Sequence, residues 1–237
     1  MSQSQELPHS IGNRLLDALP REDYARILPA LKPVSFALGD VIYLSGKTMR
    51  HVYFPTTSHI SLLYTMVEGT TAEVGLVGNE GLVGVALFMG GDQTPNQALV
   101  QGAGGAFKMG AEAMLEEFKR GGVFQRLLLG YTQTLIIQIS QTAVCNRLHS
   151  TEQRLCRWML MTHDRAHTDE LQMTHEFISN MLGILREAVS IAAHRLQDAG
   201  AIRYTRGHIK IIDRLELEKR VCECYRVVKD ELRRLLG

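Results

Sequence analysis

The sequence lacks several features that mark particular classes of protein. Its 237 residues include only four cysteines, too few for a disulfide-stapled fold. No apolar run approaches the roughly 18 residues of a membrane helix. The N-terminal segment MSQSQELPHS has no basic stretch followed by an apolar one, so we expect no secretory signal. With 26 Lys and Arg against 25 Asp and Glu, any nucleic-acid-binding surface is local. We therefore expect a soluble cytoplasmic protein without a membrane partner.

Regions of different periodicity follow one another along the chain. Residues 11–31 carry apolar positions at spacings of three and four, which predicts two short helices broken at Pro20. From Pro33 to Met109, short β-branched and aromatic runs alternate with glycine turns, a pattern typical of a β-sandwich, jelly roll or barrel. The helical period returns at Ala111. The sequence therefore predicts an α+β chain.

The segment from Phe124 onward has the pattern of a long helix. Its apolar residues recur in steps of four or three and form a heptad-like seam of Phe124, Leu128, Tyr131, Leu135, Ile139 and Thr142. A second apolar row consists of Leu129, Ile136 and Ala143. A helix buried on one side by its own domain needs no second stripe, so the pattern favours a partner helix in a dimer. A central helix of one larger core is the alternative. We expect dimerisation through Leu128, Tyr131, Leu135 and Ile139.

Residues 173–213 have the pattern of a helix-turn-helix followed by a wing. Thr174 can cap a first helix, and Gly183 can end it in the left-handed conformation. A second helix follows from Leu185 and closes at Gly200, so that a short turn holds it across the first. Beyond it, alternating residues around the turn at 206–207 predict a β-hairpin, the wing. The polar stretch HDRAHTDE before this motif is expected to be a loop.

The local charge of the motif favours nucleic acid. Between residues 184 and 210, five basic residues stand against two acidic ones, a charge of 5 − 2 = +3. Arg can donate two hydrogen bonds to guanine and Glu can accept from the cytosine amino group, so Arg186-Glu187 predicts direct base readout. Both could instead be solvated residues at a helix start. The agreement of spacing, turn, wing and charge favours DNA binding.

These motifs resemble the Crp/Fnr family of bacterial transcription regulators. FISNMLGILREAVSIAAHRLQDAG and IRYTRGHIKIIDR carry most of the resemblance, and VSFALGDVIYLSGK and VYFP extend it toward the N-terminus. It implies an α+β fold with a jelly-roll-like β-roll and N-terminal helices over residues 1–120. A dimerisation helix over residues 121–149 and a winged helix-turn-helix over residues 150–237 would follow. It also implies a homodimer that binds double-stranded DNA, with RNA polymerase as a further partner.

The resemblance also implies roles for individual residues. Arg186 and Glu187 match the family's base-contacting pair, and Ser190 lies one turn further along the same face. Ile191 stands where some members carry another arginine, which changes the expected half-site. The two recognition helices are expected to face major grooves about 34 Å apart. Backbone phosphates are expected to be bound by Thr174, Arg206 and His208.

The expected ligand pocket departs from that of cyclic-AMP-binding members. Such members use a Gly-Glu pair and a later Arg, because a buried phosphate needs a cationic partner. Here Leu82 and Asn96 stand at the Glu and Arg positions, and no Arg or Lys occurs between Arg50 and Lys108. We therefore predict no cyclic AMP binding in the usual manner. If another effector binds in the roll, we expect it near Gly81, Leu82, Asn96 and Gln97.

Other chemistry finds little support in the sequence. Some Crp/Fnr members bind an iron–sulfur cluster through N-terminal cysteines, but no cysteine precedes Cys145 here. The pair in Cys222-Glu223-Cys224 could chelate a metal or respond to oxidants, but no further ligands follow at finger-like spacing. We interpret it as two free thiols and expect no metal and no cofactor.

Alternative functions stay open at this point. No nucleophile elbow, phosphate-binding loop or paired His–Glu zinc signature occurs, so we expect no enzyme. An enzymatic alternative would use the β-region as a cupin-like metal pocket, with ligands drawn from His51, His59, Glu68, Glu73 and Glu80. In a further alternative the protein is a ligand-binding or interaction module whose winged helix docks a protein.

Overall fold

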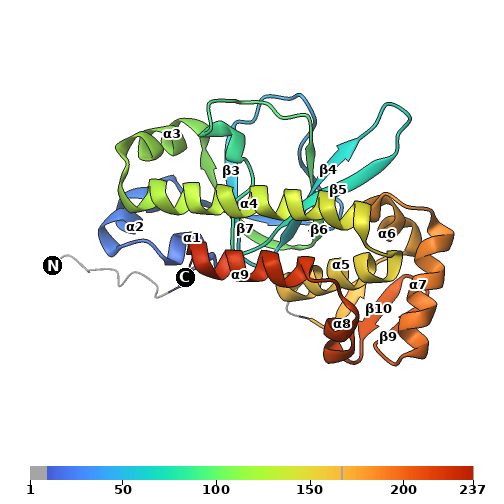
Figure 1. Ribbon diagram of the computed structural model, residues 1–237. Coiled ribbons are helices and arrows are strands. Elements are labelled where there is room, and N and C mark those ends of the chain that lie inside the picture. The colour runs from blue at the N-terminus through green and yellow to red at the C-terminus, as the bar shows by residue number, and fades with distance from the viewer. Residues whose placement is uncertain (1–9, 167, 237) are drawn as a thin grey trace.

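The computed structural model describes residues 10–166 and 168–236 of the chain (Figure 1). Residues 1–9, where we expect no secretory signal, lie outside this part. Two short helices, α1 (Arg14–Asp17) and α2 (Arg21–Ile27), precede a 3-10 turn, η1 (Leu28–Ala30). Pro20 separates the helices, as predicted, because it cannot continue α1 and stands just before α2. No helix in the described ranges is long and apolar enough to span a bilayer.

Two antiparallel sheets form the β-roll. The first has the strand order β1–β7–β3 and the second the order β2–β6–β4–β5. Large apolar side chains such as Phe54, Ile60 and Met109 are buried between them. The strands are β1 (Lys32–Phe36), β2 (Val41–Tyr43), β3 (His51–Pro55), β4 (His59–Thr65), β5 (Thr71–Val77), β6 (Gln97–Gly102) and β7 (Gly104–Gly110), with a 3-10 turn, η2 (Val85–Leu87), between β5 and β6.

A long helix runs across one face of the roll. It is α4 (Gly122–Leu148), which follows the shorter α3 (Ala111–Arg120), and the C-terminal helix α9 (Cys224–Leu236) packs along it (Figure 1). The Tyr131 ring lies so close to the roll that a Cβ atom at Gly81 would come within 2.1 Å of it. The face of α4 that carries Tyr131 therefore belongs to the core of its own chain.

The structure corrects the predicted dimerisation seam. Leu128, Tyr131 and Leu135 are 0%, 3% and 4% exposed and pack in the core of the roll, so no partner helix can contact them in this arrangement. A heptad seam indicates only that one helix face is buried, and here the roll buries it. Ile139 is partly exposed, and the second row, with Leu129 49% and Ile136 54% exposed, faces outward.

The expected loop at HDRAHTDE is also corrected. Helix α5 (Thr151–Ala166) continues through its first four residues, and β8 (Glu170–Gln172) begins at its end; His167 lies outside the described residues. Long-range partners satisfy the polar side chains on the helix. Arg165 Nε donates to Glu80 Oε1 of the roll at 2.8 Å, and Arg214 pairs with Asp164 at 2.6 Å. Polarity alone therefore misled the prediction.

Glu73 is a buried carboxyl group at the contact between the roll and α5. Ser61 has one hydroxyl hydrogen but two acceptors nearby, Glu73 Oε2 at 2.6 Å and Gln101 Oε1 at 2.9 Å. A protonated Glu73 that donates to Ser61 removes this conflict. Burial also raises the pKa of Glu73 to about 7, against the opposing effects of Ser61 and nearby arginines. The group is therefore protonated in the folded chain at mildly acid pH.

We expect Glu73→Gln to stabilise the protein at alkaline pH. An unfolded glutamate has a pKa of about 4.3, so between about pH 4.5 and 7 the folded state binds more protons. Glu73 therefore makes the free energy of unfolding fall as pH rises through this window, by roughly 3–4 kcal/mol. Glutamine keeps the hydrogen bonds without titrating. Urea denaturation at pH 4 and pH 8 should show the variant gaining stability at pH 8 alone, and an equal gain at both would contradict the assignment.

Candidate nucleic-acid interface

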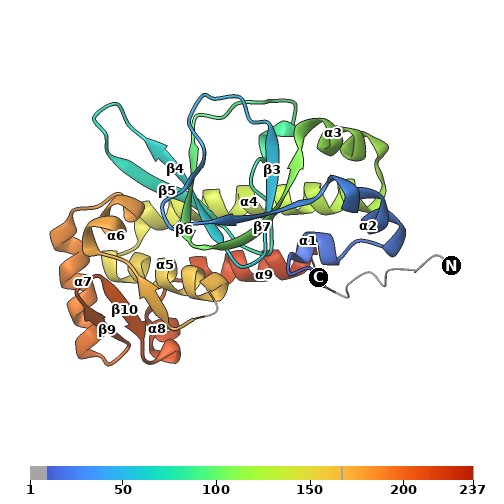
Figure 2. The same cartoon turned by 180° about the vertical axis from the view of Figure 1, so that it is seen from behind.

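The C-terminal elements gather at one end of the molecule, below the roll (Figures 1 and 2). They are α6 (His175–Leu182), α7 (Arg186–Asp198), β9 (Ile202–Thr205), β10 (His208–Ile211) and α8 (Arg214–Arg220). Strands β8, β10 and β9 form an antiparallel sheet with β10 in the centre. The predicted helix-turn-helix and wing are therefore present.

The helix-turn-helix has the caps that the sequence predicted. Thr174 Oγ1 accepts a hydrogen bond from Phe177 N at 3.1 Å and so satisfies a free donor at the start of α6. Gly183 ends α6 with φ 60° and ψ 45°, the left-handed conformation that glycine adopts most easily. Ala192 and Ala193 are buried, and their small side chains allow α7 to cross α6 closely. This packing fixes the direction in which α7 projects.

The leading end of α7 is open to solvent. Arg186 and Glu187 are both exposed, and neither side chain forms an ion pair or hydrogen bond within the described part of the chain. Leu185 precedes them as N-cap without a side-chain cap, so backbone N–H groups and the positive end of the helix dipole face outward. Ile191, 58% exposed, lies one turn beyond Glu187 on the same face. Such a surface can meet the edges of bases.

A hydrogen-bonded chain ties α7 to the start of α6. Ser190 Oγ donates to Arg186 O at 3.1 Å and lies 2.9 Å from His175 Nδ1. The His175 ring stacks on Tyr204 of β9 with 4.0 Å between centroids. Burial and the nearby Arg186 lower the pKa of His175. The sequence reasoning missed His175, because no local pattern links a residue of α6 to Ser190.

The wing lies against the start of α6. Arg206 and Gly207 form its two-residue turn with φ of 44° and 86°, the positive values that suit the twist of a hairpin. Gly207 O accepts from Met173 N at 2.7 Å, and a Cβ atom at Gly207 would lie 3.3 Å from Thr174 Cγ2. The structure therefore brings Thr174 beside the turn that carries Arg206 and leads into His208. All three are exposed.

The surface carries unpaired positive charge. Lys210 pairs with Glu170 across the sheet at 3.0 Å, which neutralises one of the five basic residues counted above. The other four are exposed and form no ion pair among the residues described: Arg186, Arg195, Arg203 and Arg206.

A separate cavity of about 170 Å³ lies between the roll and α4. Leu82 and Asn96 line it, whereas Gly81 lies beneath the Tyr131 ring and Gln97 is not part of the lining, so the cavity gathers two of the four expected ligand residues. The side-chain amide of Asn96 is already hydrogen-bonded within the protein: its Nδ2 donates to Tyr43 OH at 3.1 Å, and its Oδ1 accepts from the Thr94 hydroxyl. Within the described part of the chain, no charged side chain lines the cavity.

The chain is similar to known proteins in both sequence and fold. Residues 153–220 match the model of the Crp-like helix-turn-helix domain. The C-terminal part of the chain therefore contains a Crp-like helix-turn-helix domain. A comparison with curated proteins gave no match.

Solved structures share the fold of this chain over most of its length. FixK2 from Bradyrhizobium japonicum has a TM-score of 0.69 at 15% identity, over 81% of this chain and 98% of that one. The c-di-GMP responsive regulator CLP from Xanthomonas campestris has 0.66 at 12%, over 81% and 99%. A CRP family transcriptional regulator from Thermus thermophilus has 0.64 at 19%, over 79% and 95%. At these identities the likeness establishes the fold of the roll, long helix and C-terminal domain.

Proposed function

We propose that this protein is a homodimeric, sequence-specific DNA-binding transcription regulator of the Crp/Fnr family. The observation that carries the proposal is the exposed, unpaired Arg186-Glu187 pair at the leading end of α7, a helix that the Ser190–His175 hydrogen bond ties to the start of α6. A chain that binds bacterial DNA acts in the cytoplasm, and RNA polymerase is proposed as a partner on the family alone. The division at residues 1–120, 121–149 and 150–237 is part of the same proposal.

In this proposal the contacts divide by type. Arg186 reads guanine and Glu187 the cytosine amino group, because these pairings fit the major-groove edges of the bases. Ser190 donates a hydrogen bond from its hydroxyl to Arg186 O and so stabilises the first turn of α7, which carries Arg186 and Glu187. Ile191 presents an apolar surface that suits a thymine methyl group. Thr174, Arg206 and His208 bind phosphates and set the register.

Dimerisation in this proposal uses the exposed stripe of α4, defined as Leu129, Ile136, Ile139 and Ala143. These positions recur at heptad spacing, and they stay exposed although α9 packs along the same helix. Two α4 helices joined along this stripe would carry two α7 helices to successive major grooves, about 34 Å apart.

An effector of the roll, in this proposal, is a small neutral molecule and not a cyclic nucleotide. The cavity beside α4 has apolar walls, a few hydroxyl and amide groups, and no cation to bind a phosphate. Leu135 and Ile139 of α4 line it, so an occupant would contact the helix that carries the dimer stripe. Occupancy could in this way change how the two long helices meet.

We expect Arg186→Ala to cost roughly 1–3 kcal/mol on the cognate site and to relax selectivity at one base pair. Arg206→Ala is the contrast variant: it removes a phosphate contact, so it should weaken binding to all sequences and reduce the salt slope by about 0.9. Fluorescence anisotropy with cognate and scrambled duplexes over a salt series measures both. Equal losses on the two duplexes would show that Arg186 reads no base. An unchanged salt slope for Arg206→Ala would remove the wing from the interface.

The second candidate function is a winged helix that docks a protein. The whole chain has nearly balanced charge, which favours a protein-docking function over general binding of nucleic acid. A gel shift with bulk genomic DNA at low salt separates the two. A DNA-binding head should bind and lose affinity steeply as salt rises, because cations released from the duplex drive binding. A protein-docking head should bind little, with no salt dependence.

A further inference from the structure

Three of the four cysteines of the chain meet a histidine at one point. Cys145 lies in the last turn of α4, His149 caps the end of that helix, and Cys222 and Cys224 lie where α8 gives way to α9. Their ligand atoms all lie within 4.8 Å of one another. We propose that these four residues bind a single metal ion of the zinc type, independently of the proposed DNA-binding function.

The distances within the cluster suit one tetrahedral ion. Cys145 Sγ lies 3.6 Å from Cys222 Sγ, and Cys224 Sγ lies 3.5 Å from His149 Nδ1. Zinc binds sulfur at about 2.3 Å and nitrogen at about 2.0–2.1 Å, so a tetrahedron separates two sulfurs by about 3.8 Å and sulfur from nitrogen by about 3.6 Å. A disulfide would need its two sulfurs at about 2.05 Å.

The donor set selects the class of metal. Three thiolates and an imidazole favour zinc and other thiophilic ions, and they disfavour magnesium and calcium, which prefer oxygen. Four protein ligands fill a tetrahedron and leave no position for a substrate, so the site is structural. All three cysteines are at most 3% exposed, which shields the ion from water.

Glu223 supplies the outer support that metal-bound histidines usually have. Its Oε2 lies 3.3 Å from His149 Nε2, on the side of the ring opposite Cys224. A carboxylate there accepts the Nε2 proton and leaves the Nδ1 lone pair free to bind the metal. Glu223 itself is 74% exposed in its side chain, so it contributes little to packing.

Two neighbouring arginines, Arg157 buried and Arg154 half-buried, suit the charge of the loaded site. Three thiolates around a divalent ion leave a net charge of −1. Arg154 and Arg157 line the same small cavity as Cys145, and the Nε atom of each is buried without a hydrogen-bond acceptor in the described ranges. A buried cation needs a compensating anion, and the metal–thiolate centre provides one.

The position of the site indicates what the ion does. His149 and Ser150 form the short junction between α4 and α5, and therefore between the roll and the Crp-like domain. An ion held by Cys145, His149 and the start of α9 fastens this junction to the C-terminal helix. Metal occupancy therefore holds the Crp-like domain at a fixed orientation to α4.

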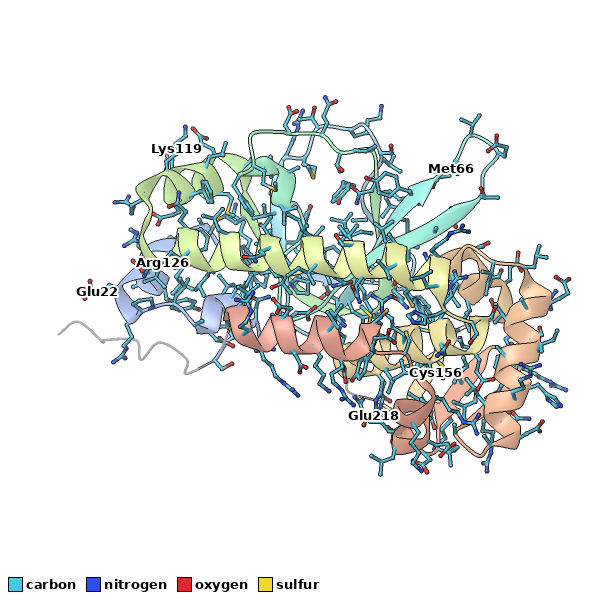
Figure 3. All side chains as sticks on the ribbon, in the orientation of Figure 1. Glu22, Met66, Lys119, Arg126, Cys156 and Glu218 are labelled. Carbon is cyan, nitrogen blue, oxygen red and sulfur yellow. The ribbon has the colours of Figure 1, made fainter. Side chains whose placement is uncertain are left out.

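The test uses the full chain, purified without an affinity tag under reducing conditions. Elemental analysis should find about one zinc ion per chain. Cys145→Ser, Cys222→Ser and Cys224→Ser should each lower it to background, with folding checked by circular dichroism. Cys156→Ser is the matched control, because Cys156 is equally buried on α5 but outside the cluster (Figure 3), and it should keep the ion. Cobalt-loaded protein should show thiolate-to-cobalt charge transfer and tetrahedral d–d bands.

A second variant keeps the test sound if the serine variants fail to fold. Glu223→Gln changes one exposed side chain and should weaken zinc affinity about 10–100-fold, measured by chelator competition. The DNA-contact variant Arg186→Ala should retain the ion in full, which separates this proposal from the DNA-binding one. A reduced chain that takes up no zinc or cobalt would overturn the site. So would metal content unaffected by the cluster variants, or a Cys145–Cys222 disulfide found in place of the ion.

Discussion

Replacing Arg165 with methionine is expected to lower the free energy of unfolding by about 3–5 kcal/mol. Arg165 on α5 and Glu80 in the roll are 8% and 6% exposed in their side chains, and Arg165 Nε donates to Glu80 Oε1 at 2.8 Å. The variant would leave a buried carboxylate without its cation, and Met161 O would lose the Arg165 Nη1 donor at 2.8 Å. Because the pair joins the roll to α5, the variant should also loosen the Crp-like domain from the roll. Urea denaturation measures the loss.

Two further variants make this expectation specific. Lys210→Met breaks an ion pair whose side chains are 51% and 70% exposed, so it should cost less than about 1 kcal/mol. Combining Arg165→Met with Glu80→Leu removes both buried charges and should restore most of the loss, because an apolar pair of similar volume needs no solvation. If Arg165→Met costs no more than Lys210→Met, the buried pair does not stabilise the fold.

The C-terminal domain could be predicted closely because its rules are local. The Thr174 side chain accepts from the amide three residues ahead at the start of α6, Gly183 ends the same helix, and the 206–207 turn joins adjacent strands. Each feature depends on positions a few residues apart, so periodicity and turn chemistry were sufficient. The positions of Arg186 and Glu187 followed from the same spacing, and the structure leaves both exposed. Whether they contact bases remains a prediction.

Long-range contacts explain where the sequence reasoning was wrong or incomplete. Residues 163–166 of the polar stretch before β8 belong to helix α5, where Arg165 forms a hydrogen bond to Glu80, 85 residues away in the sequence. Cys145 and Cys222 stand 77 residues apart, so no spacing rule could join them. The sequence placed Leu128, Tyr131 and Leu135 on one apolar face of α4, and the structure buries all three. Periodicity cannot tell whether such a face meets its own domain or a partner.

Because the exposed stripe of α4, and not its buried face, is available to a partner, Ile136→Asp is expected to convert the proposed dimer to a monomer. Ile136 is 54% exposed in the middle of the exposed stripe, so an aspartate there would place a carboxylate in a helix–helix seam. A monomer binds only one half-site, and the loss of bivalency should weaken binding to the full site by about 10²–10⁴-fold. Analytical ultracentrifugation and anisotropy measure the two effects.

Met66→Asp provides the matched control for the dimer variant. Met66 is 52% exposed and lies at the turn between β4 and β5, far from α4 (Figure 3), so the same loss of an exposed apolar side chain should leave the dimer intact. Leu128→Asp tests the original seam: because Leu128 is 0% exposed within its own chain, that variant should unfold the roll instead of yielding a folded monomer. Ile136→Asp should still bind an isolated half-site as one head of the parent does. An Ile136→Asp chain that stays dimeric would place the partner on another face of the molecule.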